Sequence, residues 1–308
     1  MTKVFIDGSQ GTTGLRIFDR LAERQDISLI TLSEELRKDP SARKEAINSS
    51  DITFLCLPDA ASIEAVAMAN ENVRILDTST AHRTSAQWIY GFPEVFENGF
   101  ERVAAANRVA VPGCHASGFI ALVKPLIDAG ILPAEALLTC HSVTGYSGGG
   151  KKMIAEYEGE GRDILLDAPR QYGLTQQHKH LREMKAVTGI NNEPVFCPIV
   201  SDFYSGMCVT VPLFKSQLVK GDASAIKEIY RNKYNGPIVQ YMDDPDEGGF
   251  ISATGVLGKD SMQIFVQGNE DRILLVARYD NLGKGASGAA LQCMNIMMGT
   301  DITSGLDL

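Results

Sequence analysis

The sequence predicts an α/β protein in which a doubly wound Rossmann domain with a parallel sheet precedes an α+β domain with a mixed, largely antiparallel sheet. Three observations support this fold class. Strand and helix patterns alternate near the N-terminus, a glycine-rich turn follows the first strand pattern, and longer strand patterns gather in the second half. The 308 residues are enough for two such domains.

The N-terminal region alternates between apolar runs of strand length and segments with apolar residues at helical spacing. Residues 52–57 (Ile-Thr-Phe-Leu-Cys-Leu) are nearly all apolar, which is typical of a strand buried on both faces of a parallel sheet. Repeats of this length form right-handed βαβ units. The predicted strands are residues 3–7, 27–32, 52–57 and 74–76, and the predicted helices are residues 13–24, 41–48 and 60–69.

The pattern changes after Cys114, where strands become longer and helices fewer. We expect the final helix, rich in alanine and other small residues, to pack back against the first domain. The predicted NADP-binding domain is therefore residues 1–114 completed by 285–308, and the predicted catalytic and oligomerisation domain is residues 115–284. The second-half elements are helices at 116–129, 176–187, 223–233 and 285–298 and strands at 136–142, 207–213, 262–268 and 273–279.

The composition of the chain limits the kinds of molecule and environment with which it can interact. The chain has 29 basic and 38 acidic residues, a formal net charge of −9, which disfavours nonspecific binding to nucleic acid or anionic membranes. No apolar run reaches the roughly 20 residues of a membrane helix, and the N-terminus lacks a signal-peptide pattern. The six cysteines show no paired metal spacing. We expect a cytoplasmic protein with reduced thiols and no metal.

A glycine-rich turn lies between the first predicted strand and helix. Gly8, Gly11 and Gly14 are spaced G-x-x-G-x-x-G, rather than the G-x-G-x-x-G of the standard dinucleotide fingerprint. With Thr12 and Thr13 at the helix start, such a turn lets backbone N–H groups approach a pyrophosphate. The alternative is a glycine-rich helix entry that binds nothing, but the strand before and the helix after favour dinucleotide binding.

The segment after the second strand indicates which dinucleotide is bound. Ser33, Arg37 and Lys38 suit the 2′-phosphate of NADP, whereas Glu34 and Glu35 suit the free ribose of NAD unless they point to solvent. All of these are also ordinary surface residues. We favour NADP(H) as the cofactor.

Cys114 is the candidate nucleophile. It stands in Val-Pro-Gly-Cys-His-Ala-Ser-Gly, residues 111–118, where a strand ends and a helix begins. A helix N-terminus lowers a thiol pKa, and its N–H groups can hold an oxyanion. The alternative is a buried structural cysteine, as expected for Cys56. A thiolate working with nicotinamide fits aldehyde oxidation or acyl reduction through a thioester, not simple alcohol oxidation.

Several longer motifs resemble the short form of the N-acetyl-γ-glutamyl-phosphate reductase family, which is grouped with aspartate-semialdehyde and glyceraldehyde-3-phosphate dehydrogenases. The resemblance runs the length of the chain. It implies NADPH-dependent reduction of an acyl phosphate to a semialdehyde through a thioester on Cys114, with release of phosphate, in arginine biosynthesis. It rests on DGSQGTTGLRI (7–17), DTSTAHR (77–83), YGFPEV (90–95), VPGCHASG (111–118), VTGYSGGGKK (143–152), HKHLREM (178–184) and DNLGKGASGAALQCMN (280–295).

The resemblance also implies roles for particular residues. It places Ser79 along the cofactor and three residues of the DNLGKG segment near the nicotinamide end. It places the Ser-Gly-Gly loop at the substrate pocket, where backbone N–H groups can bind an anion. Two-domain dehydrogenases of this kind are usually homodimers or homotetramers. The three residues near the nicotinamide end are Asn281, Gly283 and Lys284, and the residues of the substrate loop are Ser147, Gly148 and Gly149.

A histidine suits the proton transfers that this chemistry requires. His178 and His180 lie two residues apart on a predicted helix, so their side chains should be splayed by roughly 200° and only one should reach the thiol. The helix face does not decide between them, and the family pattern favours His180. We expect His115 to point away from the thiol.

Cationic side chains are candidates for binding an anionic substrate. Lys151 follows the glycine loop, and Arg83 closes the DTSTAHR motif. Related forms often carry Ala-Gly-Arg in this loop where the present chain has Gly-Gly-Lys-Lys, which leaves the identity of the anion-binding side chain open. Two alternative functions remain at this point: another phosphorylating enzyme such as aspartate-semialdehyde dehydrogenase, and a non-catalytic nucleotide-sensing protein.

Overall fold

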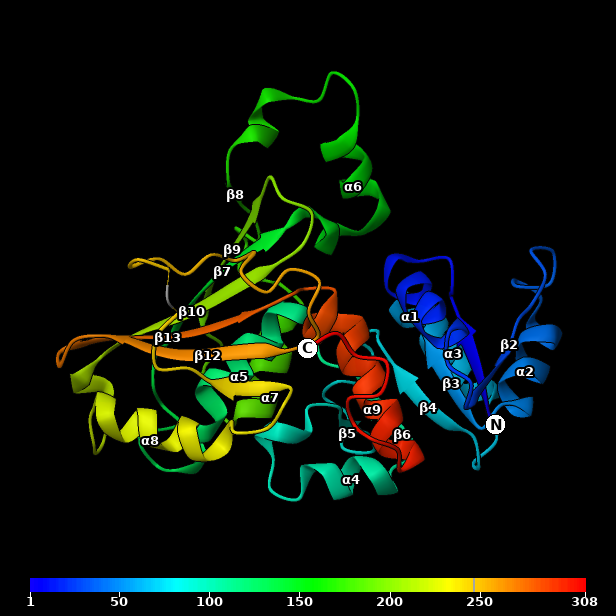
Figure 1. Cartoon of the computed structure of the whole chain (residues 1–308), viewed down its shortest axis with the longest axis horizontal. Coiled ribbons are helices and arrows are strands. Elements are labelled where there is room, and N and C mark those ends of the chain that lie inside the picture. Colours follow the sequence, from blue (N-terminus) through cyan, green and yellow to red (C-terminus); the bar gives the residue numbers. More distant parts are fainter. Residues whose placement is uncertain (246) are drawn as a thin grey trace. The chain divides into compact units, whose positions relative to one another are not determined.

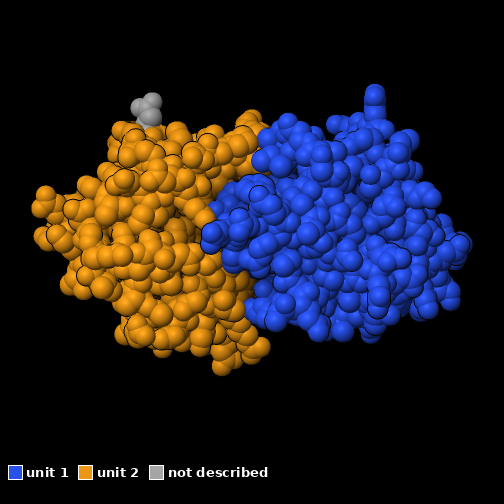
Figure 2. Space-filling model, turned by 90° about the horizontal axis from the view of Figure 1, so that it is seen from below, with its two compact units in different colours: residues 1–112, 286–306 blue, residues 113–285, 307–308 orange. Residues whose placement is uncertain are grey.

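A computed structural model describes residues 1–245 and 247–308, which form two compact units (Figures 1 and 2). The first unit comprises residues 1–112 and 286–306, and the second comprises residues 113–285 and 307–308. The boundaries predicted from the sequence assign Gly113, Cys114, Gly285 and the last two residues to the first domain, whereas their contacts place them in the second. Cys114 belongs there because it is already the first residue of the long helix of that unit.

The first unit contains a six-stranded sheet in the order β2-β1-β3-β4-β6-β5. Every strand pair is parallel, which confirms the predicted doubly wound Rossmann architecture. Strand β5 and helix α4 were not predicted, because both are short and interrupt a loop-like sequence. The elements are β1 (Thr2–Asp7), α1 (Thr12–Ala22), β2 (Ile27–Ile30), α2 (Pro40–Ser49), β3 (Ile52–Leu55), α3 (Asp59–Met68), β4 (Arg74–Asp77), β5 (Ile89–Tyr90), α4 (Gly99–Ala105), β6 (Arg108–Ala110) and α9 (Gly288–Met298).

The core of the first unit has two halves, one on each face of the sheet. Val4 and Ile6 of β1 pack into one hydrophobic cluster with α1 and α9, while Phe5, between them, packs into the other with α2 and α3. Successive strand residues point to opposite faces, so a strand buried on both sides must be apolar throughout. Helix α9 is buried along nearly its whole length, and Arg74 donates to the Met297 carbonyl at its end.

The second unit contains a seven-stranded mixed sheet in the order β11-β12-β13-β10-β7-β9-β8. Two strand pairs are parallel and the others are antiparallel, as the predicted α+β class requires. The sequence patterns missed β8, β9, β11 and α6. The elements are α5 (Cys114–Asp128), β7 (Thr139–Gly145), α6 (Gly150–Glu158), β8 (Arg170–Gln171), α7 (His180–Thr188), β9 (Val195–Ser201), β10 (Met207–Phe214), α8 (Ala223–Lys233), β11 (Val239–Tyr241), β12 (Met262–Gly268), β13 (Arg272–Tyr279) and a π-helical turn (Gly283–Ser287).

Helix α5 is the central helix of the second unit and is almost entirely buried against β10 and β13. Pro125 inside it has no N–H group, which leaves the carbonyl of Ala121 without its usual helical donor. The Tyr234 hydroxyl donates to that carbonyl at 2.6 Å, and the Tyr230 hydroxyl donates to the neighbouring Leu122 carbonyl. The helix that carries Cys114 is therefore firmly held. No helix in the described ranges is long and apolar enough to cross a membrane.

Candidate active site

The three glycines of the N-terminal turn have different structural roles. Gly8 has a φ of +89°, and a Cβ there would lie 2.3 Å from the carbonyl oxygen of Cys56. A Cβ on Gly14 would lie 2.4 Å from the carbonyl oxygen of Gly8. At Gly11 the nearest atom would be 3.5 Å away. Gly8 and Gly14 therefore allow the turn to fold onto β3, while Gly11 presents open backbone.

The start of helix α1 fits a pyrophosphate. Its N-cap is Gly11, which offers no side-chain cap, and the first turn, with Thr12 and Thr13, contains no acidic residue. Uncapped N–H groups and the positive end of the helix dipole then face whatever lies beyond the turn. These residues suit the phosphates of a dinucleotide.

The segment after β2 carries the residues predicted to select NADP. Ser33 is exposed, and its carbonyl accepts the N–H of Arg37 at 3.0 Å. The Arg37 guanidinium is partly exposed and pairs with Glu34, whose side chain is 82% exposed. Glu34 and Glu35 are both exposed, so these two carboxylates do not count against the predicted NADP.

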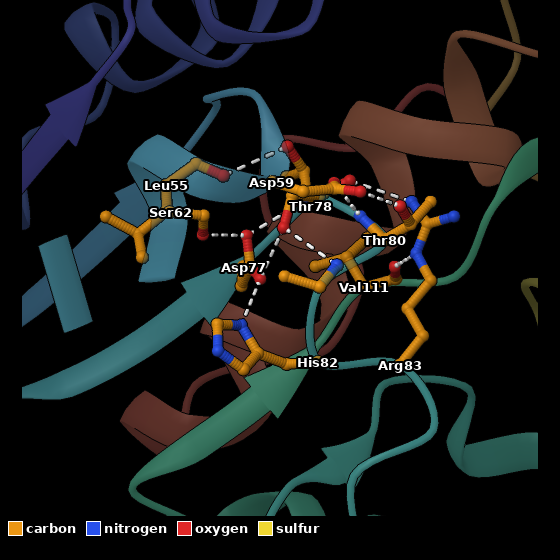
Figure 3. A network of polar contacts seen from close by, with 11 residues as sticks. Leu55, Asp59, Ser62, Asp77, Thr78, Thr80, His82, Arg83 and Val111 are labelled. Atoms are coloured by element: carbon orange, nitrogen blue, oxygen red, sulfur yellow. Dashed lines mark hydrogen bonds and ion pairs between the residues drawn. The ribbon is translucent and has the colours of Figure 1, made fainter. Parts of the chain in front are cut away.

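A buried carboxylate, Asp77, organises the segment after β4 (Figure 3). Ser79 was predicted to contact the cofactor, yet its N–H and hydroxyl both donate to Asp77, at 2.9 and 2.7 Å. Arg83, predicted to bind substrate, donates to the carbonyls of Thr78 at 2.7 Å and Val111 at 2.8 Å. Within the first unit, both residues thus serve to shape the loop.

Cys114 begins helix α5 and is partly exposed. The N–H of Gly113, just before it, donates to Oε1 of Glu183 at 2.8 Å, which ties the helix start to α7. Elsewhere burial makes thiols inert: it raises the pKa of Cys56 to about 12 and that of Cys208 to about 11. Cys114 has the helix-terminal position that favours a thiolate.

Tyr279 fixes the first turn of α5. Its hydroxyl donates to the Cys114 carbonyl at 2.5 Å and accepts the Gly118 N–H at 3.0 Å. A Cβ on Gly118 would lie 2.7 Å from this hydroxyl, so glycine is needed there. Gly285 approaches from the other side, where an added Cβ would lie 3.1 Å from Cβ of Cys114.

His178 and His180 form a cluster with His115 rather than a splayed pair. Helix α7 begins at His180, so His178 precedes the helix, and the predicted divergence of about 200° is wrong. The two rings lie 4.7 Å apart, and the His180 N–H donates to Nδ1 of His178 at 3.2 Å. The ring of His115 lies 5.9 Å from His178 and 5.7 Å from His180.

His115 is a buried member of this cluster and not a surface residue. Its Nδ1 is 2.6 Å from the Ser142 hydroxyl and its Nε2 is 2.7 Å from the Tyr172 hydroxyl. Burial and, to a smaller extent, the neighbouring His178 lower the pKa of His115 to about 3. Burial also lowers the pKa of His178, as does Lys179, against the opposing effect of Glu183. Both pKa shifts favour the neutral form of His115 and His178.

The predicted substrate loop lies beside the Asn281–Gly285 segment within the second unit. Asn281 donates to the Ser147 hydroxyl at 3.0 Å and accepts the Gly206 N–H at 2.8 Å. Lys284 is buried in the π-helical turn. A Cβ on Gly283 would lie 2.0 Å from the Lys259 carbonyl oxygen, so this glycine allows close packing. The exposed loop residues are Gly148, Gly149 and, at the start of α6, Lys151.

Sequence reasoning missed the residues that hold the predicted ones in place. Tyr279 ends a predicted strand, but nothing in the pattern shows that it reaches Cys114. Glu183 and Tyr172 become recognisable only when α7 and β8 pack beside α5. Among the described residues, no group of three His, Cys, Asp or Glu side chains is arranged to hold a metal ion.

Comparisons with known proteins place the chain in a family. Residues 3–103 match the semialdehyde dehydrogenase NAD binding domain, and residues 114–281 match the semialdehyde dehydrogenase dimerisation domain. The chain belongs to the semialdehyde dehydrogenase family, and its first unit carries the dinucleotide-binding domain that the glycine turn predicts.

Individual relatives narrow the resemblance. The chain is 44% identical to N-acetyl-gamma-glutamyl-phosphate reductase 2 of Nostoc sp., covering 99% of each chain. It is 45% identical to N-acetyl-gamma-glutamyl-phosphate reductase of Brucella ovis, covering 96% of this chain and 99% of that one. These relatives confirm the family resemblance found in the motifs.

Solved structures support the fold. Aspartate semialdehyde dehydrogenase II of Vibrio cholerae superimposes with a TM-score of 0.71 at 17% identity, covering 97% of this chain and 98% of that one. The aspartate semialdehyde dehydrogenase of Candida albicans, solved with NADP, gives 0.66 at 15% identity, covering 98% and 99%.

Proposed function

We propose that the chain reduces N-acetyl-γ-glutamyl phosphate to N-acetylglutamate semialdehyde and phosphate, with NADPH as reductant, as a step of arginine biosynthesis. The observation that carries this proposal is a partly exposed cysteine, Cys114, at a helix start, in the same unit as a cluster of three imidazoles. The relatives at 43–45% identity support the choice of substrate.

The protein groups have defined tasks in this reaction. The Cys114 thiolate attacks the acyl carbon, phosphate departs, and a thioester forms. The reduced dinucleotide supplies a hydride, which converts an acyl group to an aldehyde. His180, with His178 as the alternative, takes the thiol proton and returns it to the sulfur when the carbon–sulfur bond breaks. The N–H groups at the start of α5 stabilise the oxyanion.

Substrate anions are assigned to the loop beside Asn281. Ser147, Gly148 and Gly149 offer hydroxyl and backbone donors, and Lys151 adds a positive charge at the start of α6. Gly8, Gly11 and Gly14 with Thr12 and Thr13 are assigned to the pyrophosphate, Ser33 and Arg37 to the 2′-phosphate, and Asn281, Gly283 and Lys284 to the nicotinamide end.

The proposal includes a homodimer or homotetramer acting in the cytoplasm. Helices α5 and α8 pack against one face of the second sheet. On the opposite face, alternate residues of β10 are partly exposed or exposed, among them Pro212 and Phe214. That face suits a second copy, in keeping with the dimerisation domain that residues 114–281 match. Light scattering on the purified protein measures the assembly directly.

The decisive experiment measures NADPH oxidation with N-acetyl-γ-glutamyl phosphate and, in parallel, with β-aspartyl phosphate. We expect turnover with the first and at least about 100-fold lower kcat/KM with the second, a difference of about 2.7 kcal/mol. The variant Cys114→Ala should lose at least about 10³-fold in kcat while binding NADPH normally. Equal turnover of the two acyl phosphates, or an active Cys114→Ala enzyme, would contradict the proposal.

A further inference from the structure

We propose that Asp77 is a positioning residue for the dinucleotide: it fixes the loop of residues 78–83 as one wall of the cofactor crevice, and Ser79 acts through it. This inference rests on the proposed NADPH-dependent function and deepens it. In this proposal the Ser79 side chain does not contact the cofactor itself but holds the loop in place through its hydrogen bonds to Asp77.

The Asp77 carboxylate is fully buried and surrounded by donors. The Ser62 hydroxyl and the Ser79 N–H reach Oδ1 at 2.7 and 2.9 Å. The Ser79 hydroxyl reaches Oδ2 at 2.7 Å, and Nδ1 of His82 lies 2.6 Å from the same oxygen. Three of these four partners belong to the loop, and Figure 3 shows Ser62 and His82 pointing at the carboxylate from two sides of the network. A buried polar network whose members all have partners is rigid.

The same loop is tied to the neighbouring strand and helix at two further points. Thr80 donates through its N–H and its hydroxyl to Asp59, the first residue of α3, at 2.9 and 2.5 Å. Thr78 donates through both groups to the Leu55 carbonyl at the end of β3. Residues 78–82 therefore have a single backbone path, set by groups at the ends of β3 and β4.

The loop lies at the edge of the sheet where a ligand is expected. The chain leaves β1 toward β2 and returns to β3 on the other side of β1, so the order of strands reverses between β1 and β3. Open parallel sheets bind ligands beyond the carboxyl ends of the strands at such a point. Gly8 packs against the Cys56 carbonyl just after β3, and residues 78–83 follow β4, the next strand.

The chain contains a built-in reporter of this loop. Trp88 is the single tryptophan of the sequence. Its ring is stacked on His82, with ring centroids 4.1 Å apart and an interplanar angle of 14°. Because His82 is held by Asp77, a loop released from Asp77 should change the Trp88 emission.

Ser79→Ala and Ser62→Ala form a matched pair for the test. Each variant removes one buried hydroxyl that donates to Asp77 at 2.7 Å, but Ser79 is in the loop and Ser62 is on helix α3. After Ser62→Ala, the loop retains all three of its own bonds to the carboxylate. Equilibrium titration with NADPH, thermal unfolding, Trp88 emission and steady-state kinetics are measured on both variants.

We expect Ser79→Ala to raise the Kd and KM for NADPH about tenfold, with kcat changed less than about twofold and altered Trp88 emission. Ser62→Ala should lower the Tm by about as much as Ser79→Ala does, because each variant loses one buried hydrogen bond to Asp77. It should change the Kd for NADPH by less than about twofold. Asp77→Asn, which cannot accept all four bonds, should exceed Ser79→Ala in its effect on Kd.

Equal changes in Kd for the two serine variants, or changes in Tm alone, would overturn the inference, because either result describes a purely structural carboxylate. A wild-type protein that does not bind NADPH would instead refute the proposed function. The titration needs no acyl phosphate, so the two failures are distinguishable.

Discussion

In the first unit, the buried Asp77 carboxylate is surrounded by N–H and O–H donors. In the second unit, three histidine rings pack against one another, His115 and His178 also pack against Phe196, and His115 is hydrogen-bonded to side chains at both ring nitrogens. Both clusters lie at the ends of secondary-structure elements. The two clusters differ in how their buried polar groups are surrounded: hydrogen-bond donors surround the carboxylate, whereas burial lowers the pKa of His115 and His178.

We relate this difference to two functions, cofactor binding in the first unit and proton transfer in the second. A carboxylate whose two oxygens are both hydrogen-bonded holds a loop in one geometry, which suits the binding of a large cofactor. The lowered pKa values of His115 and His178 keep these imidazoles neutral at ordinary pH and make them weaker bases than a free imidazole, so the proton transfer is assigned first to His180. We therefore expect substitutions in the first cluster to change cofactor affinity, and substitutions in the second to change turnover and pH dependence.

The largest effect should come from the histidines. His180→Asn is expected to lower kcat by about 10²- to 10⁴-fold, because general acid–base catalysis contributes that much. His178→Asn should cost at least about tenfold less, and neither variant should change the Kd for NADPH. Steady-state kinetics and NADPH titration of both variants test this. The reverse order of the two effects would assign the proton transfer to His178.

Gly8→Ala should be the most damaging change in the first unit. The added Cβ would meet the Cys56 carbonyl oxygen at 2.3 Å in a backbone region that disfavours side chains. We expect a loss of about 2–3 kcal/mol or more in the free energy of unfolding, measured by urea denaturation. Gly11→Ala is the control, with less than about 1 kcal/mol lost but weaker NADPH binding. Similar stability of the two variants would contradict the role given to Gly8.

Acid should destabilise the histidine cluster. The pKa of His115 falls from 6.5 to about 3 in the folded protein, so the unfolded chain binds more protons between these values. The stabilisation from neutral His115 is complete above pH 6.5 and is lost as the pH falls toward 3. By linkage, the stability lost at pH 5 relative to neutral pH amounts to about 2 kcal/mol, and the loss continues toward pH 3. The lowered pKa of His178 acts in the same direction.

The measurement is urea denaturation at several pH values, with His115→Gln as the matched variant. Glutamine can still bond Ser142 and Tyr172 but does not titrate. Its unfolding free energy should therefore fall less steeply below pH 6.5 than that of the wild type. Parallel pH profiles would show that another group carries the dependence.

The smallest effect concerns cofactor choice. Arg37→Ala should weaken NADPH binding about three- to tenfold and leave NADH binding nearly unchanged, because the partly exposed guanidinium is screened by water. Lys38→Ala is the neighbouring control and should change the ratio less. Isothermal titration with both dinucleotides gives the two constants. Equal weakening for NADPH and NADH would remove Arg37 from the 2′-phosphate site.

The sequence was most informative where a pattern is local. The strands around residues 3–7 and 52–57, the glycine turn and the helix that starts at Cys114 all follow from spacing within about fifteen residues. The patterns missed β9 and α6. In β9, Pro198 and a break in alternation obscure the strand, and α6 follows glycines that normally end a helix.

By itself the sequence determined the fold class, the family and the residue types available for chemistry, because apolar periodicity, glycine turns and long motifs are properties of neighbouring residues. Only the tertiary structure decided that His178 and His180 share one cluster with His115. It also decided that the Ser79 N–H and hydroxyl donate to Asp77, and that the Tyr279 hydroxyl donates to the Cys114 carbonyl. Tyr279 lies 165 positions from Cys114 along the chain. Such contacts arise from packing between separate elements, where small differences in helix start and side-chain direction decide which polar atoms meet.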